Sequence, residues 1–372
     1  MGDNANKFFT ATAILVGTCI GAGVLGIPYV ASRAGFFAAL GYIIFLGLLI
    51  MLVNLYLGEI SLRTKQTHQI TGYAGKYLGR NGKRIITFAV IFGIYSAIIA
   101  YILGVGESLS FLIFENSSYS IYLGIFFGVV MSGLIWRGMR ELKRFEKIGV
   151  SIVLLLLLAI FFIFVRDVNF NNLTYINSGN IFLPFGVVLF ALLCFSAVPE
   201  VRMVLHKNEK MMKKAIIVSS LISIIFYSLF AFVVVGFKGL ETPQIATLAL
   251  GSVFVLLGIF TMFTSYLALG NALMESLMFD QRLKKRSAWF LSSVIPVILF
   301  FLIKFFNIFS FVGILSIGGV ISGGITIIAI LFMVKKAKRK GDRKPEYSIS
   351  INWFVVGILS LIFILGIVWE IL

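Results

Sequence analysis

The chain has 372 residues, of which 60% are hydrophobic and only 13% charged, and its mean hydropathy is +1.04. This composition excludes a water-soluble globular domain and is typical of a polytopic membrane protein. The net charge of +17 does not indicate a nucleic-acid partner, because the cations lie almost entirely between apolar runs.

Eleven apolar runs are long enough to cross a bilayer, which takes about 20 helical residues. The third and eighth runs are longer than a perpendicular crossing requires and suit a strongly tilted helix. We therefore predict an all-α membrane protein with eleven spans, at residues 8–32, 36–60, 84–114, 121–136, 148–165, 183–205, 211–236, 247–279, 288–303, 309–334 and 353–371.

The cations alternate strongly between the two ends of these spans. Of the 32 lysines and arginines, all but four fall in connections on one side. By the positive-inside rule, that side is cytoplasmic, which predicts a cell-membrane protein with a cytoplasmic N-terminus and an extracytoplasmic C-terminus. The same connections favour contact with anionic lipid headgroups. The four exceptions are Arg33, Arg166, Lys238 and Lys304.

The first and sixth spans each contain a helix-breaking stretch. Residues 17–28 read GTCIGAGVLGIP, and residues 190–200 read FALLCFSAVPE. Proline removes a backbone donor, and glycine loosens a helix. We predict breaks near residues 17–23 and 194–199. Broken backbone at membrane depth requires surrounding protein or a wet cavity.

The spans also repeat. The first five and the next five start at a nearly constant offset of roughly 170 residues, and an odd number of spans inverts the second set. This predicts inverted repeats at 1–182 and 183–345, an extra span within 346–372, and a substrate site between the two breaks. Helix packing is the other interpretation of the glycines, and it is favoured for SIGGVISGG at 316–324.

These stretches, together with AYILGVGESL in the third span, resemble the amino acid/polyamine/organocation superfamily. Within it, the chain is similar to the hydroxy- and aromatic-amino-acid permeases and the related amino acid/auxin permeases, over essentially its whole length. The resemblance implies a LeuT-like fold of five plus five inverted helices with one added helix. It also implies amino acid transport by alternating access.

The resemblance implies that the amides of the first break face the substrate α-carboxylate, and the partial positive charge of a half-helix N-terminus independently favours an anion there. Carbonyls of the opposing break would receive the α-ammonium. Many relatives have histidine where Phe195 stands, so the pocket here is more apolar. Ordinary packing remains the alternative for the aromatic residues. The implied substrate-binding set is Thr18, Cys19, Gly21, Ala22, Gly23, Tyr101, Phe190, Cys194, Phe195 and Ser196.

In the eighth span, TMFTS places three hydroxyl residues on one helical face. Hard cations prefer oxygen ligands, and the group resembles the sodium site of LeuT-fold carriers. The alternative is that these hydroxyls bond to carbonyls of their own helix. The expected sodium ligands are Gly17, Ile20, Thr261, Thr264 and Ser265.

Proton coupling would need a titratable group near the path. Glu107 and Glu200 are the candidates, although Glu107 fits a place near outer water and Glu200 could pair with Arg202. The fifth span lacks the lysine that replaces sodium in some proton-driven relatives, which favours sodium.

We therefore expect a sodium-coupled symporter of neutral amino acids, large and apolar or aromatic, with no further cofactor. Proton-coupled symport and a non-transporting receptor or scaffold remain alternatives. A channel would need a polar lining that the spans lack. An enzyme is disfavoured, since His68 and His206 lie in connections and neither cysteine has a partner at ligand spacing.

Overall fold

The computed structural model describes residues 2–21, 23–137, 154–155, 157–279 and 281–371, and every regular element in them is a helix. Residues 157–164 of the predicted fifth span are also helical, while part of that span lies outside the described residues. The α-helices are α1 (Gly2–Cys19), α2 (Gly23–Ala34), α3 (Phe36–Arg63), α4 (Ile70–Phe114), α5 (Ser120–Arg137), α7 (Phe170–Thr174), α8 (Pro184–Leu192), α9 (Ala197–Val204), α10 (Met212–Lys238), α11 (Ser252–Phe279), α12 (Lys285–Trp289), α13 (Ile295–Phe305), α14 (Phe311–Gly318), α15 (Gly324–Lys340) and α16 (Trp353–Ile371).

Two π-helical turns interrupt long spans. One joins α12 to α13 at Phe290–Val294, and the other joins α14 to α15 at Gly319–Gly323. Short 3-10 turns fill several of the connections, at Val165–Asp167, Ser178–Asn180, Glu209–Met211, Gly239–Glu241 and Ala246–Ala249.

Nine helical stretches in the described residues are long and apolar enough to cross a membrane, and the bent pair α1 and α2 raises the number to ten. This agrees with the predicted polytopic helical protein. The one predicted span not counted here is the fifth, at residues 148–165, which lies partly outside the described residues.

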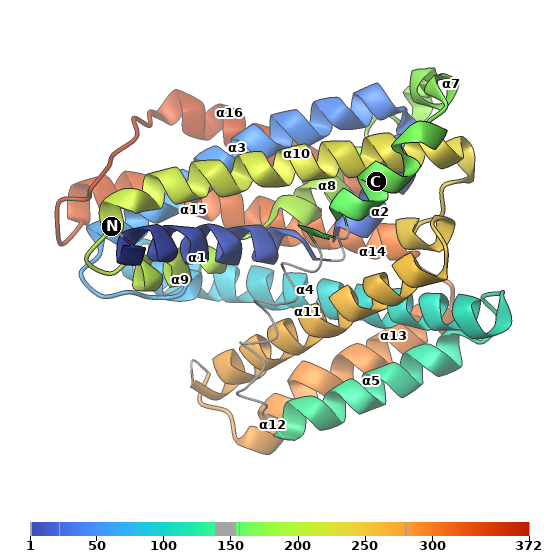
Figure 1. Ribbon diagram of the computed structural model, residues 1–372. Coiled ribbons are helices and arrows are strands. Elements are labelled where there is room, and N and C mark those ends of the chain that lie inside the picture. Colours follow the sequence, from blue (N-terminus) through green and yellow to red (C-terminus); the bar gives the residue numbers. More distant parts are fainter. Residues whose placement is uncertain (1, 22, 138–153, 156, 280, 372) are drawn as a thin grey trace.

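The helices form two packed groups, and the span made of α14 and α15 lies between them (Figure 1). Helices α1, α2, α3, α8, α9 and α10 contact one another, and α4, α5, α11 and α13 form the second group. Helices α14 and α15 contact both groups, whereas α16 packs mainly on α15 and leaves most of its surface outward. The two broken spans therefore lie inside the first group, next to the second.

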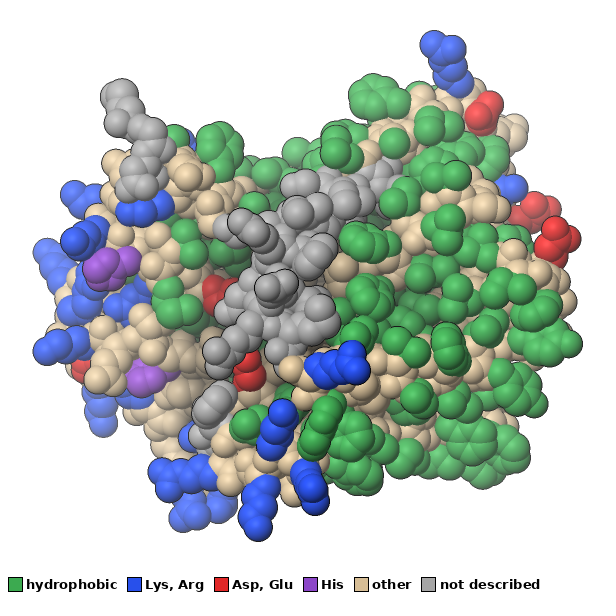
Figure 2. Space-filling view, turned by 60° about the horizontal axis from the view of Figure 1, so that its bottom comes forward, with side chains coloured by type: hydrophobic (Ala, Val, Ile, Leu, Met, Phe, Trp, Pro, Cys, Tyr) green, Lys and Arg blue, Asp and Glu red, His purple; other side chains and the backbone are tan. Residues whose placement is uncertain are grey.

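The charged residues gather at the ends of the helices. Figure 2 shows lysine and arginine crowded at one end and a broad hydrophobic band beside it. The N-terminus lies at one end of the long helices and the C-terminus at the other (Figure 1).

Both predicted breaks are present, but their limits differ from the prediction. The first is short, from α1 ending at Cys19 to α2 beginning at Gly23, and the two helices bend by 54°. The second separates α8 at Leu192 from α9 at Ala197. The prolines do not end the irregular stretches: Pro28 lies inside α2, and Pro199 lies in the first turn of α9, where a missing N–H has no helical partner to lose.

The third span begins earlier than predicted. Helix α4 runs from Ile70 and is bent at Gly79, whose φ of 81° lies in the left-handed region that glycine adopts freely. A search for continuous apolar runs misses this start, because its buried residues Ile70, Tyr73, Ala74 and Tyr77 alternate with polar ones.

A connector, residues 341–352, joins α15 to α16 across the end of α3. Its anchor is Glu59, a fully buried carboxylate that accepts from Arg63 Nε, Lys338 Nζ and Ser348 Oγ, each at 2.8 Å, and from the Ile349 amide at 2.9 Å. A buried carboxylate is tolerated when it is paired and hydrogen-bonded, as here.

Candidate functional site

One tyrosine joins the two breaks. The hydroxyl of Tyr227, on α10, is shared between the carbonyl of Cys19 at 2.7 Å and the carbonyl of Ala191 at 2.8 Å. The Tyr227 side chain is completely buried. Carbonyls released where a helix ends need a partner when water is absent, and this hydroxyl supplies one to both broken helices.

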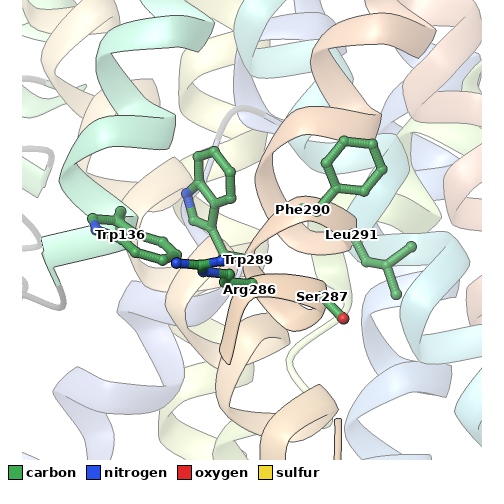
Figure 3. Close-up of a pocket in the computed structure, with 6 residues that line it drawn as sticks. All are labelled: Trp136, Arg286, Ser287, Trp289, Phe290 and Leu291. Atoms are coloured by element: carbon green, nitrogen blue, oxygen red, sulfur yellow. The ribbon is translucent and has the colours of Figure 1, made fainter. Parts of the chain in front are cut away.

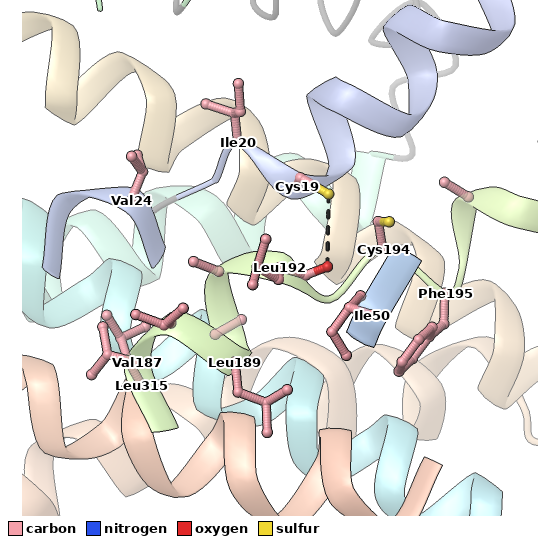
Figure 4. Packing of buried hydrophobic residues seen from close by; sticks show 14 of the residues in the cluster. Cys19, Ile20, Val24, Ile50, Val187, Leu189, Leu192, Cys194, Phe195 and Leu315 are labelled. Atoms are coloured by element: carbon pink, nitrogen blue, oxygen red, sulfur yellow. Dashed lines mark hydrogen bonds between the residues drawn. The ribbon is translucent and has the colours of Figure 1, made fainter. Parts of the chain in front are cut away.

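The two cysteines lie at the edges of the breaks (Figure 4). Cys19 Sγ donates to the Leu192 carbonyl at 3.7 Å, and Cys194 Sγ accepts from Asn54 Nδ2 at 3.2 Å. Both thiols are buried, and Asn54 Oδ1 is buried with no hydrogen-bond partner. The predicted proximity of Cys19 and Cys194 to the break region is therefore present in the structure.

Gly21 is the point where three elements meet. A Cβ placed on Gly21 would lie 3.3 Å from the hydroxyl of Tyr101, on α4, and 3.9 Å from the hydroxyl of Ser265, on α11. Tyr101 is 4% exposed. The first break thus faces the second helix group through hydroxyls, and both residues were among the predicted ligands.

Close backbone approach explains another glycine of the first break. A Cβ on Gly23 would lie 2.7 Å from Ala191 Cα and 3.1 Å from Phe190 Cδ1, so a side chain there would collide with α8. The ring of Phe190 also lies 3.3 Å from the Cβ position of Gly318. Phe190 is helical rather than part of the break, and its ring stands between α2 and the tenth span.

The tenth-span glycines serve close packing, as the sequence favoured. Cβ positions on Gly318 and Gly319 would lie 2.6 Å from Ser96 Cβ and 2.7 Å from Phe190 N. The π-helical turn at Gly319–Gly323 therefore packs tightly behind the second break.

The remaining residues of the predicted substrate set are spread over the two breaks. Thr18 is in the last turn of α1 and donates to the Ile14 carbonyl at 2.8 Å. The amide of Gly21 donates to the Cys19 carbonyl at 2.9 Å. Phe195 is buried and Ser196 exposed within the second break. Ala22 lies outside the described residues.

Two of the three predicted sodium ligands on α11, Thr261 and Thr264, use their hydroxyl protons within the helix. Thr261 donates to the Leu257 carbonyl at 2.9 Å, and Thr264 donates to the Thr261 carbonyl at 3.0 Å. A hydroxyl that donates in this way keeps its oxygen lone pairs as acceptors. Gly17 is in α1, and Ile20, whose amide donates to Val16, follows its last residue.

The two predicted proton-coupling residues lie in different parts of the molecule. Glu107, on α4, accepts from Lys304 Nζ at 2.8 Å, and both side chains are mostly buried. Glu200 is exposed on α9. Arg202, which the sequence offered as a partner for Glu200, is buried and donates to the carbonyls of Ser61 and Lys65.

Sequence reasoning missed Tyr227 and Asn54. Each is a polar residue inside an apolar span, and an intramembrane hydrogen-bonding side chain is itself a signal of contact with another helix. Among the described residues, no three His, Cys, Asp or Glu side chains cluster as a metal site would require. The described residues named above at the two breaks supply carbonyls, hydroxyls, thiols and aromatic rings.

Comparisons with known proteins identify relatives of this chain. Residues 4–249 match the tryptophan/tyrosine permease family. The chain is 26% identical over 226 residues to tyrosine-specific transport system 1 of Haemophilus influenzae, covering 60% of this chain and 56% of that protein. It is 22% identical over 236 residues to glutamine transporter 2 of Aliivibrio fischeri, covering 62% of this chain and 61% of that one.

A shorter match, over 110 residues, is 32% identical to tyrosine-specific transport system 2 of Haemophilus influenzae and covers 28% of this chain and 26% of that protein. The chain thus spans little more than half the length of the first two relatives.

The fold matches a solved structure titled as the inward-facing conformation of Mhp1, with a TM-score of 0.65 and 14% identity, covering 97% of this chain and 88% of that one. This confirms the LeuT-like fold that the resemblance implied. The family is one of permeases and not of enzymes, and its match covers both breaks. The chain belongs to the tryptophan/tyrosine permease family.

Proposed function

We propose that the protein is a secondary active transporter that carries aromatic amino acids together with sodium by alternating access. The observation that supports this best is the joining of two broken spans by Tyr227, with Gly21 facing Tyr101 and Ser265. Paired discontinuous helices are the usual setting of a transporter's substrate site. The tyrosine-specific relatives support the aromatic class.

In this proposal, the substrate carboxylate binds at the first break. The Gly21 amide exchanges its hydrogen bond to the Cys19 carbonyl for one to the carboxylate. The Tyr101 hydroxyl, which lies beside Gly21, donates a second hydrogen bond to the same carboxylate. Carbonyls of the second break receive the ammonium group, and Phe190 and Phe195 line the space for the ring. An apolar pocket with a few convergent polar groups suits such a ligand.

Sodium would bind between α11 and the first break. Ser265 lies beside Gly21, and the hydroxyl oxygen of Thr264 can bind a cation while it donates to the Thr261 carbonyl, which would be a further ligand. The carbonyls of Gly17 and Ile20 would complete an oxygen shell of the kind hard cations prefer. The Lys304 partner of Glu107 supports a structural role for that carboxylate over proton coupling.

The orientation and repeats belong to the same proposal. The lysine- and arginine-rich end, which Figure 2 shows, would face the cytoplasm, placing the N-terminus inside and the C-terminus outside. The units 1–182 and 183–345 would be the inverted repeats, each supplying one break, with α16 added outside them.

Thermal stability with each of the twenty amino acids, in sodium and in potassium, tests substrate and ion together. Ligands that bind the folded state raise its apparent stability. We expect tyrosine and tryptophan to stabilise the protein in sodium more than in potassium. Equal stabilisation in both salts would contradict sodium coupling.

A matched pair of variants locates the ion. Thr264→Ala with Ser265→Ala should weaken the sodium effect, whereas Thr87→Ala with Ser228→Ala should not, although Thr87 and Ser228 make similar bonds to their own helices. Equal losses in the two double variants would assign the α11 hydroxyls to helix packing alone.

A further inference from the structure

A groove lies on the surface away from the broken spans, where α5 ends and α12 begins. It has a volume of about 580 Å³ and is lined by Trp136, Arg286, Ser287, Trp289, Phe290 and Leu291 (Figure 3). A smaller adjoining hollow of about 310 Å³ adds Gly133 to the same two tryptophans. The lining is almost entirely apolar except at the arginine.

The aromatic walls are held in place. Trp289 Nε1 donates to the Ser132 carbonyl at 2.8 Å, which fixes the indole of α12 against α5. The rings of Trp136 and Trp289 meet edge to face, with centroids 5.2 Å apart. A wall that is already ordered loses little further freedom when a ligand binds.

Cations stand at one side of this apolar groove. Lys285 Nζ lies 5.0 Å from the centre of the Trp136 ring, and Arg286 is exposed beside the two indoles (Figure 3). Within the described chain neither cation forms an ion pair with a carboxylate. Both cations are exposed at the surface, where an anionic ligand in the groove would meet them.

The combination of features selects one kind of ligand. Tryptophan at a helix end is typical of the membrane–water interface, and an arginine fork matches the oxygens of a phosphate. A soluble phosphate would gain nothing from the indole and phenyl walls, whereas a phospholipid carries both a phosphate for the cations and an apolar chain for the walls. We propose that this groove binds one anionic phospholipid, its phosphate on Lys285 and Arg286 and an acyl chain along Trp136, Trp289 and Phe290.

Tryptophan fluorescence can report this binding directly. The chain has four tryptophans, so Trp353→Phe with Trp369→Phe leaves only the groove pair. This protein is reconstituted with brominated phosphatidylglycerol or brominated phosphatidylcholine in bilayers that otherwise match. We expect the anionic lipid to quench the groove tryptophans with a clear preference over the zwitterionic lipid.

Charge variants in that background assign the preference. Removing each cation, Lys285→Gln or Arg286→Gln, should lower the preference for phosphatidylglycerol by about fivefold. Lys335→Gln is the matched control, because Lys335 lies outside the groove and, in the unchanged chain, its Nζ lies 4.9 Å over an aromatic ring, that of Trp353, which is Phe in this background. It should leave the preference unchanged.

The outcomes separate the proposal from general surface attraction. Equal quenching by the two lipids overturns it, and so does a preference that survives loss of both groove cations or falls equally in Lys335→Gln. The single variants Lys285→Gln and Arg286→Gln are measured beside the variant that carries both changes. If the variant with both changes folds poorly, the single variants still test the proposal. Glycerol phosphate added in solution should not compete, and full competition by it would assign the site to a headgroup alone.

Discussion

At the scale of single residues, uncharged side chains form the hydrogen bonds to polar groups at the two breaks. Tyr227 bonds to a carbonyl from each break, and Asn54 bonds to the Cys194 thiol next to the second. The hydroxyl of Tyr101 lies at Gly21. Uncharged groups of this kind can bind both ends of a zwitterion without leaving an unpaired charge when no ligand is bound.

Tyr227→Phe should leave two buried carbonyls without this donor. An unsatisfied buried polar group costs about 1–3 kcal/mol, so we expect a lower free energy of unfolding and a lower thermal midpoint in detergent. Tyr122→Phe is the control, since Tyr122 is 71% exposed. An unchanged midpoint in Tyr227→Phe would show that the shared hydroxyl bond is unimportant.

Gly23→Ala should damage the site through sterics alone. The added Cβ would lie 2.7 Å from Ala191 Cα, and overpacking of this kind costs about 1–3 kcal/mol. Gly41→Ala is the control, because nothing lies within 4 Å of its Cβ position. We expect amino acid binding to fall in Gly23→Ala and to stay normal in Gly41→Ala. Normal binding in both would place the ligand away from the contact between α2 and α8.

At the scale of elements, the connector at 341–352 ties the end of α3 to α15. Besides Glu59, Asp342 binds the Lys65 amide at 2.8 Å and the Lys76 ammonium, and Tyr347 donates to the Leu55 carbonyl at 2.8 Å. Burial raises the pKa of Tyr347 well above its usual 10.0, so this hydroxyl stays protonated. These bonds hold together helices from both packed groups.

The Asp342 bonds should depend on pH. The Lys65 amide, followed by Lys76, lowers the pKa of Asp342 below its ordinary value of 3.8. A depressed folded-state pKa means that the stabilisation is fully present above that ordinary value and is lost as pH falls through the folded-state pKa. Protection of the connector amides, which is their exchange rate compared with the intrinsic rate at the same pH, should therefore decrease in acid.

Asp342→Asn provides the comparison. Its connector amides should be less protected at neutral pH and should show no further loss of protection in acid. If wild type and variant show the same pH dependence, another group controls the opening of the connector.

Much of this architecture could be predicted from sequence, and the exceptions have physical causes. Apolar runs and alternating cations predicted the spans, because the bilayer imposes both. The second break ends before the predicted limit at Pro199, since proline is tolerated in the first turn of a helix. Tyr227 was missed because its partners are backbone carbonyls more than 30 residues away in the chain, a contact that local pattern does not encode.

At the scale of the whole molecule, the two helix groups explain why a transporter would need both breaks. One group contains the breaks, and the other presents Tyr101 and Ser265 to them. In the proposed transport cycle, relative movement of the two groups would open the junction between them to one side or the other. Substrate and the proposed sodium ion at this junction would then couple binding to that movement.

Uptake of labelled tyrosine into proteoliposomes tests the central claim most directly. We expect accumulation under an inward sodium gradient, insensitivity to a protonophore when the membrane potential is clamped, and loss of uptake in Gly23→Ala but not in Gly41→Ala. Correctly folded protein that accumulates neither tyrosine nor tryptophan under this gradient would contradict the proposed transport function. Accumulation without sodium that a protonophore abolishes would contradict the coupling ion alone.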